Sequence, residues 1–389
     1  MIAVPRSLPI VLLGLVLACA DPGGEPVETG IPVRVATFNV EILSREKVDQ
    51  VDERGRGRNP QLLKAAEIVQ RVRPDVLLLN EIDFDGGATP RLFVERYLQV
   101  DRDGQSGVDY PHVYCEASNT GVLSGFDLDD DGKTDSPEDG WGFGHYPGQY
   151  AMALLSRFPI DAEAARTFHL LRWQAMPGNL MPDGQDGKPA WFDPEEAAAL
   201  RLSSKSHWDV PVRIGGVVVH VLASHPTPPV FDGDEDRNGR RNFDEIRLWA
   251  DYLSDAAGYL VDDRGGRGGL PAGASFVLLG DFNADPYNDR APYGTTAIGQ
   301  LLDHPRVRDP LPRAPGGAEV EREYAGPADT RTSSWGRLDY VLPSHDLEVR
   351  DSGVFWPASD DPLDRLVSGD EAASDHHLVW VDLVVPNGI

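Results

Sequence analysis

Short apolar runs of strand length recur through the chain from residue 33 onward, and this pattern limits the fold more than any other feature of the sequence. In residues 75–82 (DVLLLNEI) four apolar residues stand in succession, which indicates a strand buried on both faces. Residues 61–72 and 243–260 place apolar residues at helical spacing instead. Further strands are expected at residues 34–40, 150–156, 210–214, 217–224, 275–280, 338–342, 347–355 and 378–384, and a further helix at 89–100. Because strands and helices alternate and no linker separates two halves, the sequence predicts one α/β domain over residues 33–389.

Polar residues stand where several of these apolar runs end. In open α/β sheets ligands bind at strand ends, where polar groups meet solvent on a rigid frame. Carboxylates, carboxamides and imidazoles gathered there are what a phosphate-processing metal site needs. Each residue also has an ordinary explanation, because Asp and Asn favour turns and a Glu at a strand end is often solvated. The candidates are Asn39, Glu81, His225, Asp281, Asn283, Asp339, Asp375 and His376.

Six short motifs surround these candidates. They are FNVE at 38–41, NEID at 80–83, SHPTPP at 224–229, GDFNADP at 280–286, RLDY at 337–340 and SDHH at 374–377. Each motif is weak alone, but in this order and spacing the chain resembles the endonuclease/exonuclease/phosphatase superfamily over roughly residues 33–385. That superfamily includes pancreatic-type deoxyribonucleases, abasic-site endonucleases, inositol-polyphosphate 5-phosphatases and bacterial sphingomyelinases. The resemblance implies a four-layer α/β sandwich, in which two packed, mostly antiparallel mixed β-sheets are flanked by helices.

The resemblance also implies a catalytic metal. Glu81 would be the principal carboxylate ligand, with Asn39 and Asp375 beside it. Magnesium, or manganese in its place, suits these oxygen ligands and a phosphate substrate. The implied cofactor is therefore a hard divalent cation.

The remaining candidates receive roles in the chemistry from the same resemblance. Asp281 would align or deprotonate the attacking water, and Asn283 would hydrogen-bond the phosphate. His376 would contact the phosphoryl oxygens, oriented by the carboxylate of Asp339, while His225 would assist the leaving oxygen. Members of the superfamily differ in which group acts as the base, so the resemblance leaves that assignment open.

Two acidic segments match the spacing of a twelve-residue calcium loop. Both have a glycine at the sixth position, where such a loop turns sharply. In residues 127–138 the expected ligands are Asp127, Asp129, Asp131, Asp135 and Glu138. In residues 234–245 they are Asp234, Asp236, Asn238, Asn242 and Glu245. Calcium is therefore expected at one or both loops, and the alternative is two solvated acidic loops.

The charge of the chain bears on its partners. With 63 acidic and 36 basic residues the formal net charge is −27, which repels nucleic acid unless metal ions or a basic patch reverse the field locally. No long basic and aromatic stripe marks a nucleic-acid track. Arg201, Lys205 and His207 precede the predicted hairpin. We interpret them as surface charge, and the alternative is that they hold extra phosphates.

Three functions remain open at this stage. The leading one is a metal-dependent phosphoester hydrolase of the phosphodiesterase or nuclease-like type, with a phosphorylated substrate. The first alternative is a phosphomonoesterase acting on small phosphorylated compounds. The second is a calcium-binding surface module whose catalytic site has decayed, although the complete set of motifs argues against it.

The N-terminus predicts export. Arg6 precedes an apolar run over residues 8–18, which is too short to span a bilayer, where ~20 residues are needed, but suits a signal peptide. Cys19 ends a segment that resembles a lipobox, so residues 1–19 are interpreted either as a lipoprotein signal or as a cleaved secretion signal. Residues 20–32 then form a flexible linker. The expected location is periplasmic, on the outer membrane through a lipid anchor, or extracellular, and the oligomeric state stays open.

Overall fold

The computed structural model describes residues 30–182, 184, 190–369 and 371–388. The predicted signal at residues 1–19 and residues 20–29 of the predicted linker lie outside this part of the chain. The last residues of that linker belong to the first strand, which begins at Gly30 because it pairs with the C-terminal strand from there onward. In the described part of the chain, none of the helices has both the length and the apolar composition that a membrane span requires. Export and lipid anchoring stay predictions.

The first sheet joins strands from both ends of the chain, in the order β10-β11-β1-β2-β4-β3. Its central pair, β1 and β2, is parallel, whereas β11 runs antiparallel to β1. The strands are β1 (Gly30–Leu43), β2 (Val76–Ile82), β3 (His112–Tyr114), β4 (Ala151–Ser156), β10 (Glu348–Val354) and β11 (Val379–Pro386).

The second sheet comes from the middle of the chain, in the order β5-β6-β7-β8-β9. Here β7 and β8 form the parallel pair, and β9 runs antiparallel to β8. The strands are β5 (Arg166–Thr167), β6 (His207–Ile214), β7 (Val217–Ser224), β8 (Ser275–Asp281) and β9 (Asp339–Pro343). The two-residue β5 and the three-residue β3 at the sheet edges are strands that the sequence pattern did not predict.

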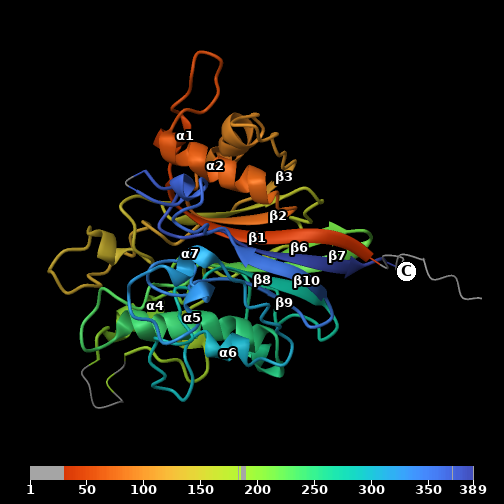
Figure 1. Cartoon of the computed structure of the whole chain (residues 1–389). Helices are drawn as coiled ribbons and strands as arrows, with labels where there is room; N and C mark the ends of the chain where they lie inside the picture. Colours follow the sequence, from red (N-terminus) through yellow and green to blue (C-terminus); the bar gives the residue numbers. More distant parts are fainter. Residues whose placement is uncertain (1–29, 183, 185–189, 370, 389) are drawn as a thin grey trace, which may run out of the picture.

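The two sheets pack face to face and helices cover their outer faces (Figure 1). Leu78 of β2 and Leu279 of β8 belong to the cluster between the sheets. Leu77, the neighbour of Leu78, faces the other way and packs with α2. Leu278 likewise packs with α5 beyond the second sheet. Successive residues of a strand point to opposite faces, so burial on both faces explains the continuous apolar runs. The fold is the expected four-layer α/β sandwich.

Each of the three predicted helices has a counterpart in the structure, with a large difference at the third, and four further short helices in the described part of the chain were not predicted. Helix α2 starts with Pro60 after Asn59, whose side chain accepts a hydrogen bond from the Leu62 N–H and caps the helix. The α-helices are α1 (Arg45–Val48), α2 (Pro60–Val72), α3 (Ala88–Phe93), α4 (Pro194–Ala199), α5 (Arg237–Tyr252), α6 (Gly299–Leu302) and α7 (Pro315–Ala318). A π-helical turn spans Val94–Leu98, and 3₁₀ turns span Pro137–Asp139, Trp173–Ala175, Asp255–Tyr259, Ala328–Thr330 and Asp364–Leu366.

The second predicted calcium loop, residues 234–245, is wrong as a loop. Helix α5 begins at Arg237, six residues earlier than predicted, so Gly239 lies inside the helix and makes no sharp turn. Three of the predicted ligands, Asn238, Asn242 and Glu245, are therefore helical residues, and Asp234 and Asp236 precede the helix. Asn242 and Glu245 are buried and bind backbone groups of neighbouring loops. These side chains hold the fold together where the sequence pattern predicted calcium.

The first predicted loop, residues 127–138, has part of the expected geometry. Gly132 has a φ of +86°, as the sharp turn requires. Asp127, Asp129 and Asp139 offer oxygen atoms that all lie within 4.8 Å of one another. The predicted ligands Asp131, Asp135 and Glu138 are exposed. Asp139, which the pattern did not include, is buried and accepts hydrogen bonds from two backbone N–H groups of the loop. Calcium at this loop stays a prediction.

His207, the first residue of β6, predicts acid sensitivity of the fold. It is fully buried, its Nε2 lies 2.9 Å from the Glu245 carbonyl oxygen and its Nδ1 lies 2.6 Å from Ser203 Oγ. Burial lowers the pKa of His207 to about 4. The pKa of the folded state is thus below the unfolded value of about 6.5, so the unfolded chain takes up this proton first as the pH falls.

The free energy of unfolding is therefore expected to decrease as the pH falls from 6.5 toward 4, with His207 contributing up to about 3 kcal/mol. Urea unfolding of the wild type and of His207→Gln, between pH 7.5 and 4, measures this contribution. Glutamine keeps a donor for the Glu245 carbonyl but does not titrate, so its pH slope should be shallower. Equal slopes for the two proteins would contradict the assignment.

Candidate functional site

The topology explains why residues from six distant motifs meet. Strands β1 and β2 are parallel, so their ends bring Asn39 close to Glu81. Strands β7 and β8 are also parallel, and their ends bring His225, the residue after β7, close to Asp281. Because β9 is antiparallel to β8, its first residue, Asp339, pairs directly with the last residue of β8. In the same way, β11 is antiparallel to β1, so the residues just before β11 return to this edge.

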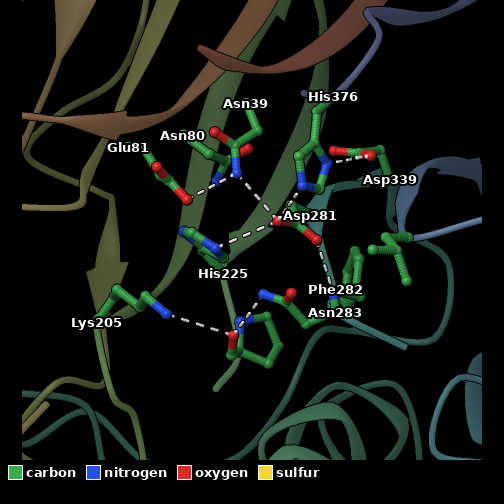
Figure 2. A network of polar contacts seen from close by, with 12 residues as sticks. Asn39, Asn80, Glu81, Lys205, His225, Asp281, Phe282, Asn283, Asp339 and His376 are labelled. Atoms are coloured by element: carbon green, nitrogen blue, oxygen red, sulfur yellow. Dashed lines mark hydrogen bonds and ion pairs between the residues drawn. The ribbon is translucent and has the colours of Figure 1, made fainter. Parts of the chain in front are cut away.

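Asn39 joins the two sheets at the site. Its Nδ2 donates to Glu81 Oε1 at 3.0 Å and to Asp281 Oδ2 at 3.1 Å, so a single carboxamide links a carboxylate of each sheet (Figure 2). Its Oδ1 accepts a hydrogen bond from the Glu41 N–H at 3.1 Å. Glu81 has a φ of +62° at an irregularity between β2 and β4. A non-glycine residue held in this conformation is costly and marks a position that the surrounding structure enforces.

Asp281 lies between two imidazoles. Its Oδ2 is 3.8 Å from His376 Nε2 and 3.4 Å from His225 Nε2, and both histidines are buried (Figure 2). The other side of His376 contacts Asp339, whose Oδ2 lies 2.8 Å from His376 Nδ1. Thr332 Oγ1 donates to the same carboxylate oxygen at 2.7 Å. A continuous series of polar contacts therefore runs from His225 through Asp281 and His376 to Asp339.

Burial and the charges of neighbouring groups determine the protonation states of Asp281, Asp339 and His376. Burial would lower the pKa of His376, but the carboxylates of Asp339 and Asp281 raise it well above its usual range. Burial acts to raise the pKa of Asp281, yet His376 and His225 hold it well below its usual range. Burial raises the pKa of Asp339 to about 6. At neutral pH the site therefore holds an imidazolium beside an ionised Asp281.

His225 is the neutral histidine of the site. Burial lowers its pKa, and the nearby ammonium of Lys205 lowers it further. Its Nδ1 has no hydrogen-bond partner within the described structure. Asn283, two residues after Asp281, has a φ of +50° and directs its Nδ2 to the Pro226 carbonyl oxygen at 3.1 Å. His225 and Asn283 thus both lie close to Asp281, on the side of the Pro226 loop.

A second group of carboxylates lies next to Asn39. The third predicted metal ligand, Asp375, is exposed and its backbone N–H donates to Glu41 Oε2 at 3.2 Å. Burial, together with the negative charges of Asp375 and Glu81, raises the pKa of Glu41. Asp375 and Glu81 thus repel Glu41, and carboxylates in such an arrangement are hard oxygen donors that a divalent cation stabilises. Sequence reasoning did not single out Glu41, although it stands in the FNVE motif two residues after Asn39.

A second set of ligand atoms lies deeper. Asp281, Asp339 and His376 offer atoms that all lie within 4.8 Å of one another. His376 Nδ1 and one oxygen of Asp339 are already bonded to each other, whereas Asp339 Oδ1 has no partner. The carboxylates beside Asn39 fit a hard divalent cation, whereas the deeper set would bind one only with His376 deprotonated, because an imidazolium has no lone pair to offer.

The structure also reveals a buried lysine at the site. Lys205 and His207 are buried, so the interpretation of these residues as surface charge is wrong for both. Arg201 is half-buried and donates to Asn119 Oδ1 at 2.5 Å. The segment before β6 folds inward because Glu245 of α5 accepts hydrogen bonds from the N–H and Oγ of Ser204. No local sequence signal indicates this contact, since its two residues are 41 positions apart.

Comparison with known proteins shows the family of the chain. A profile of the Endonuclease/Exonuclease/phosphatase family matches residues 36–376. No curated protein sequence matches the chain. Among solved structures, an endonuclease/exonuclease/phosphatase from Beutenbergia cavernae is similar with a TM-score of 0.51 and 19% identity, over 91% of this chain and 72% of that chain. The human Nocturnin catalytic domain is similar with a TM-score of 0.47 and 15% identity, over 90% of this chain and 93% of that chain.

Proposed function

The chain belongs to the endonuclease/exonuclease/phosphatase family, whose members hydrolyse phosphoester bonds with the help of a metal, and we propose that it is a magnesium-dependent phosphodiesterase. The observation that carries this proposal is the placement of Asp281 between two buried imidazoles, with Asn39 linking it to Glu81. One ionised carboxylate is thereby positioned among groups that bind or transfer protons. In-line displacement at phosphorus requires an activated water and stabilisation of the oxygens that gain charge.

The side chains have complementary roles in this proposal. Asp281, ionised at neutral pH, orients and deprotonates the attacking water. The His376 imidazolium, oriented by Asp339, donates to a phosphoryl oxygen. Neutral His225 donates a hydrogen bond toward the leaving oxygen, and Asn283 hydrogen-bonds the phosphate. A histidine beside the leaving oxygen suits hydrolysis of either ester, because the alkoxide released from a diester or a monoester needs a nearby donor.

Glu81, Glu41, Asp375 and Asn39 would hold the cation at the mouth of the site. When bound there, a magnesium ion supplies positive charge to the phosphoryl oxygens. Asn39 keeps Glu81 and Asp281 in fixed positions through its two hydrogen bonds. The acidic surface repels a phosphorylated substrate less once these carboxylates are neutralised.

The proposal is tested with purified protein on bis(p-nitrophenyl) phosphate, p-nitrophenyl phosphate and plasmid DNA, first with magnesium and then with EDTA. We expect hydrolysis of the diester with magnesium and loss of that activity in EDTA. Cleavage of p-nitrophenyl phosphate alone would identify a phosphomonoesterase instead. The absence of hydrolysis of all three substrates with every divalent cation tried would reject a hydrolase of this type.

A further inference from the structure

Lys205 is a buried cation whose hydrogen-bonding capacity is largely unused. Its side chain is only 7% exposed, yet its Nζ donates to one acceptor, the Pro226 carbonyl oxygen, over a long 3.4 Å. Among the described residues, no carboxylate lies within ion-pair distance of this ammonium. An ammonium group has three donors, and burying one without an anionic partner is costly. The fold therefore keeps a charged donor where it gains little from the protein itself.

The position of Lys205 is fixed from both sides by one carboxylate of α5. Glu245 accepts hydrogen bonds from the Ser204 N–H at 2.7 Å and from the Thr227 N–H at 2.6 Å. It thus clamps the residue before Lys205 and the residue after Pro226. Both flanking segments are thereby tied to the same residue of α5, which fixes the position of the ammonium between them.

Lys205 faces the catalytic residues. Figure 2 shows its side chain below His225, with the Nζ directed at the Pro226 carbonyl oxygen, which also accepts the Asn283 Nδ2 at 3.1 Å. The Lys205 ammonium and the Asn283 carboxamide therefore donate to the same carbonyl oxygen. Burial lowers the pKa of Lys205, and the negative charges of Glu245, Glu81 and Asp281 act against that shift, although none of them forms an ion pair with the lysine. A phosphoryl group placed among these residues would have oxygens within reach of both donors.

We propose that the Lys205 ammonium is a substrate ligand, which binds a non-bridging oxygen of the phosphoryl group opposite His376. This inference rests on the proposed function, since it assigns the residue to the same site. Lys205 and His376 would then supply positive charge from two sides of the phosphorus, beyond the charge that the metal supplies. Hydrogen bonds between charged groups in such a setting contribute more than neutral ones.

The test compares the wild type with Lys205→Met, Lys205→Gln and Lys205→Arg, and uses Arg54→Met as a control for the loss of one exposed positive charge. Two quantities are measured for each protein: the inhibition constant of inorganic phosphate and kcat/KM on bis(p-nitrophenyl) phosphate. We expect Lys205→Met and Lys205→Gln to raise the inhibition constant and to lower kcat/KM by roughly 10- to 100-fold each. Lys205→Arg, which keeps the charge, should retain phosphate inhibition better than either, and Arg54→Met should match the wild type.

Calorimetric titration of phosphate into the magnesium-loaded proteins separates this inference from the proposed function. If the wild type hydrolyses none of the substrates but binds phosphate and Lys205→Gln does not, the proposed function fails and the ligand assignment holds. If Lys205→Gln, folded by circular dichroism, binds phosphate within about twofold of the wild type, the assignment is overturned. Should Lys205→Met fail to fold, Lys205→Gln decides, because glutamine keeps a donor for the Pro226 carbonyl.

Discussion

Replacement of Asp281 by asparagine is expected to lower kcat on the diester by roughly 10²- to 10⁴-fold, the range for loss of a positioned acid or base. Asparagine has nearly the same shape and can still accept a hydrogen bond from Asn39, but it cannot take a proton. The low pKa of Asp281 means that the wild-type carboxylate is ionised throughout the neutral range, so the deficit should not recover at higher pH. A pH series of kcat from 6 to 9 measures both the size of the loss and its pH dependence.

The control for this substitution is Asp303→Asn, which removes an exposed carboxylate outside the site. It should leave kcat unchanged. The Asp281→Asn protein should remain folded, although its two histidines lose their common anion and their pKa values fall. An Asp281→Asn enzyme that retains more than about a tenth of the wild-type kcat would remove Asp281 from the role of general base.

The strands and their polar ends were predictable because both leave a local signal. A run such as residues 76–79 has no polar residue to expose, which predicts a strand that is buried on both faces. The polar residues that follow the run then indicate where the strand approaches the edge of the sheet. The pairing of β8 with β9 then places Asp339 beside Asp281, although the two residues are 58 positions apart and no local signal links them. Convergence of the motifs could be expected from the family resemblance, and the topology gives its physical cause.

The errors arose where a local pattern has two physical meanings. DEDRNG at residues 234–239 matches the start of a calcium loop, but its last three residues are the first turn of an amphipathic helix. The choice between a calcium loop and a helix depends on Glu245, which binds Ser204 and Thr227. These two partners are distant in sequence, so the sequence pattern does not indicate the contact. Lys205 shows the same limitation. A single lysine is usually solvated, and only the packing of α5 against the segment before β6 buries this one.

Replacement of Glu81 by glutamine is expected to lower kcat/KM by roughly 10³-fold or more, since a catalytic metal contributes several kcal/mol to transition-state stabilisation. Glutamine can still accept the hydrogen bond from Asn39, so the geometry of the site is preserved while one negative charge is lost. The activity should remain low at magnesium concentrations that saturate the wild type. Glu163→Gln, which changes an exposed glutamate, serves as the matched control.

Thermal unfolding distinguishes loss of the metal from damage to the fold. In EDTA, Glu81→Gln should melt at the same temperature as the wild type or higher, because one charge is removed from the repelling group of Glu41, Glu81 and Asp375. Magnesium should raise the melting temperature of the wild type, since a ligand that binds only the folded state stabilises it, and should raise that of the variant less. A variant with an unchanged magnesium-dependent shift would place the cation elsewhere, and the deeper group of Asp281, Asp339 and His376 would become the candidate. The magnesium-dependent shift in melting temperature, compared between the wild type and Glu81→Gln, therefore shows which carboxylates hold the metal without any measurement of turnover.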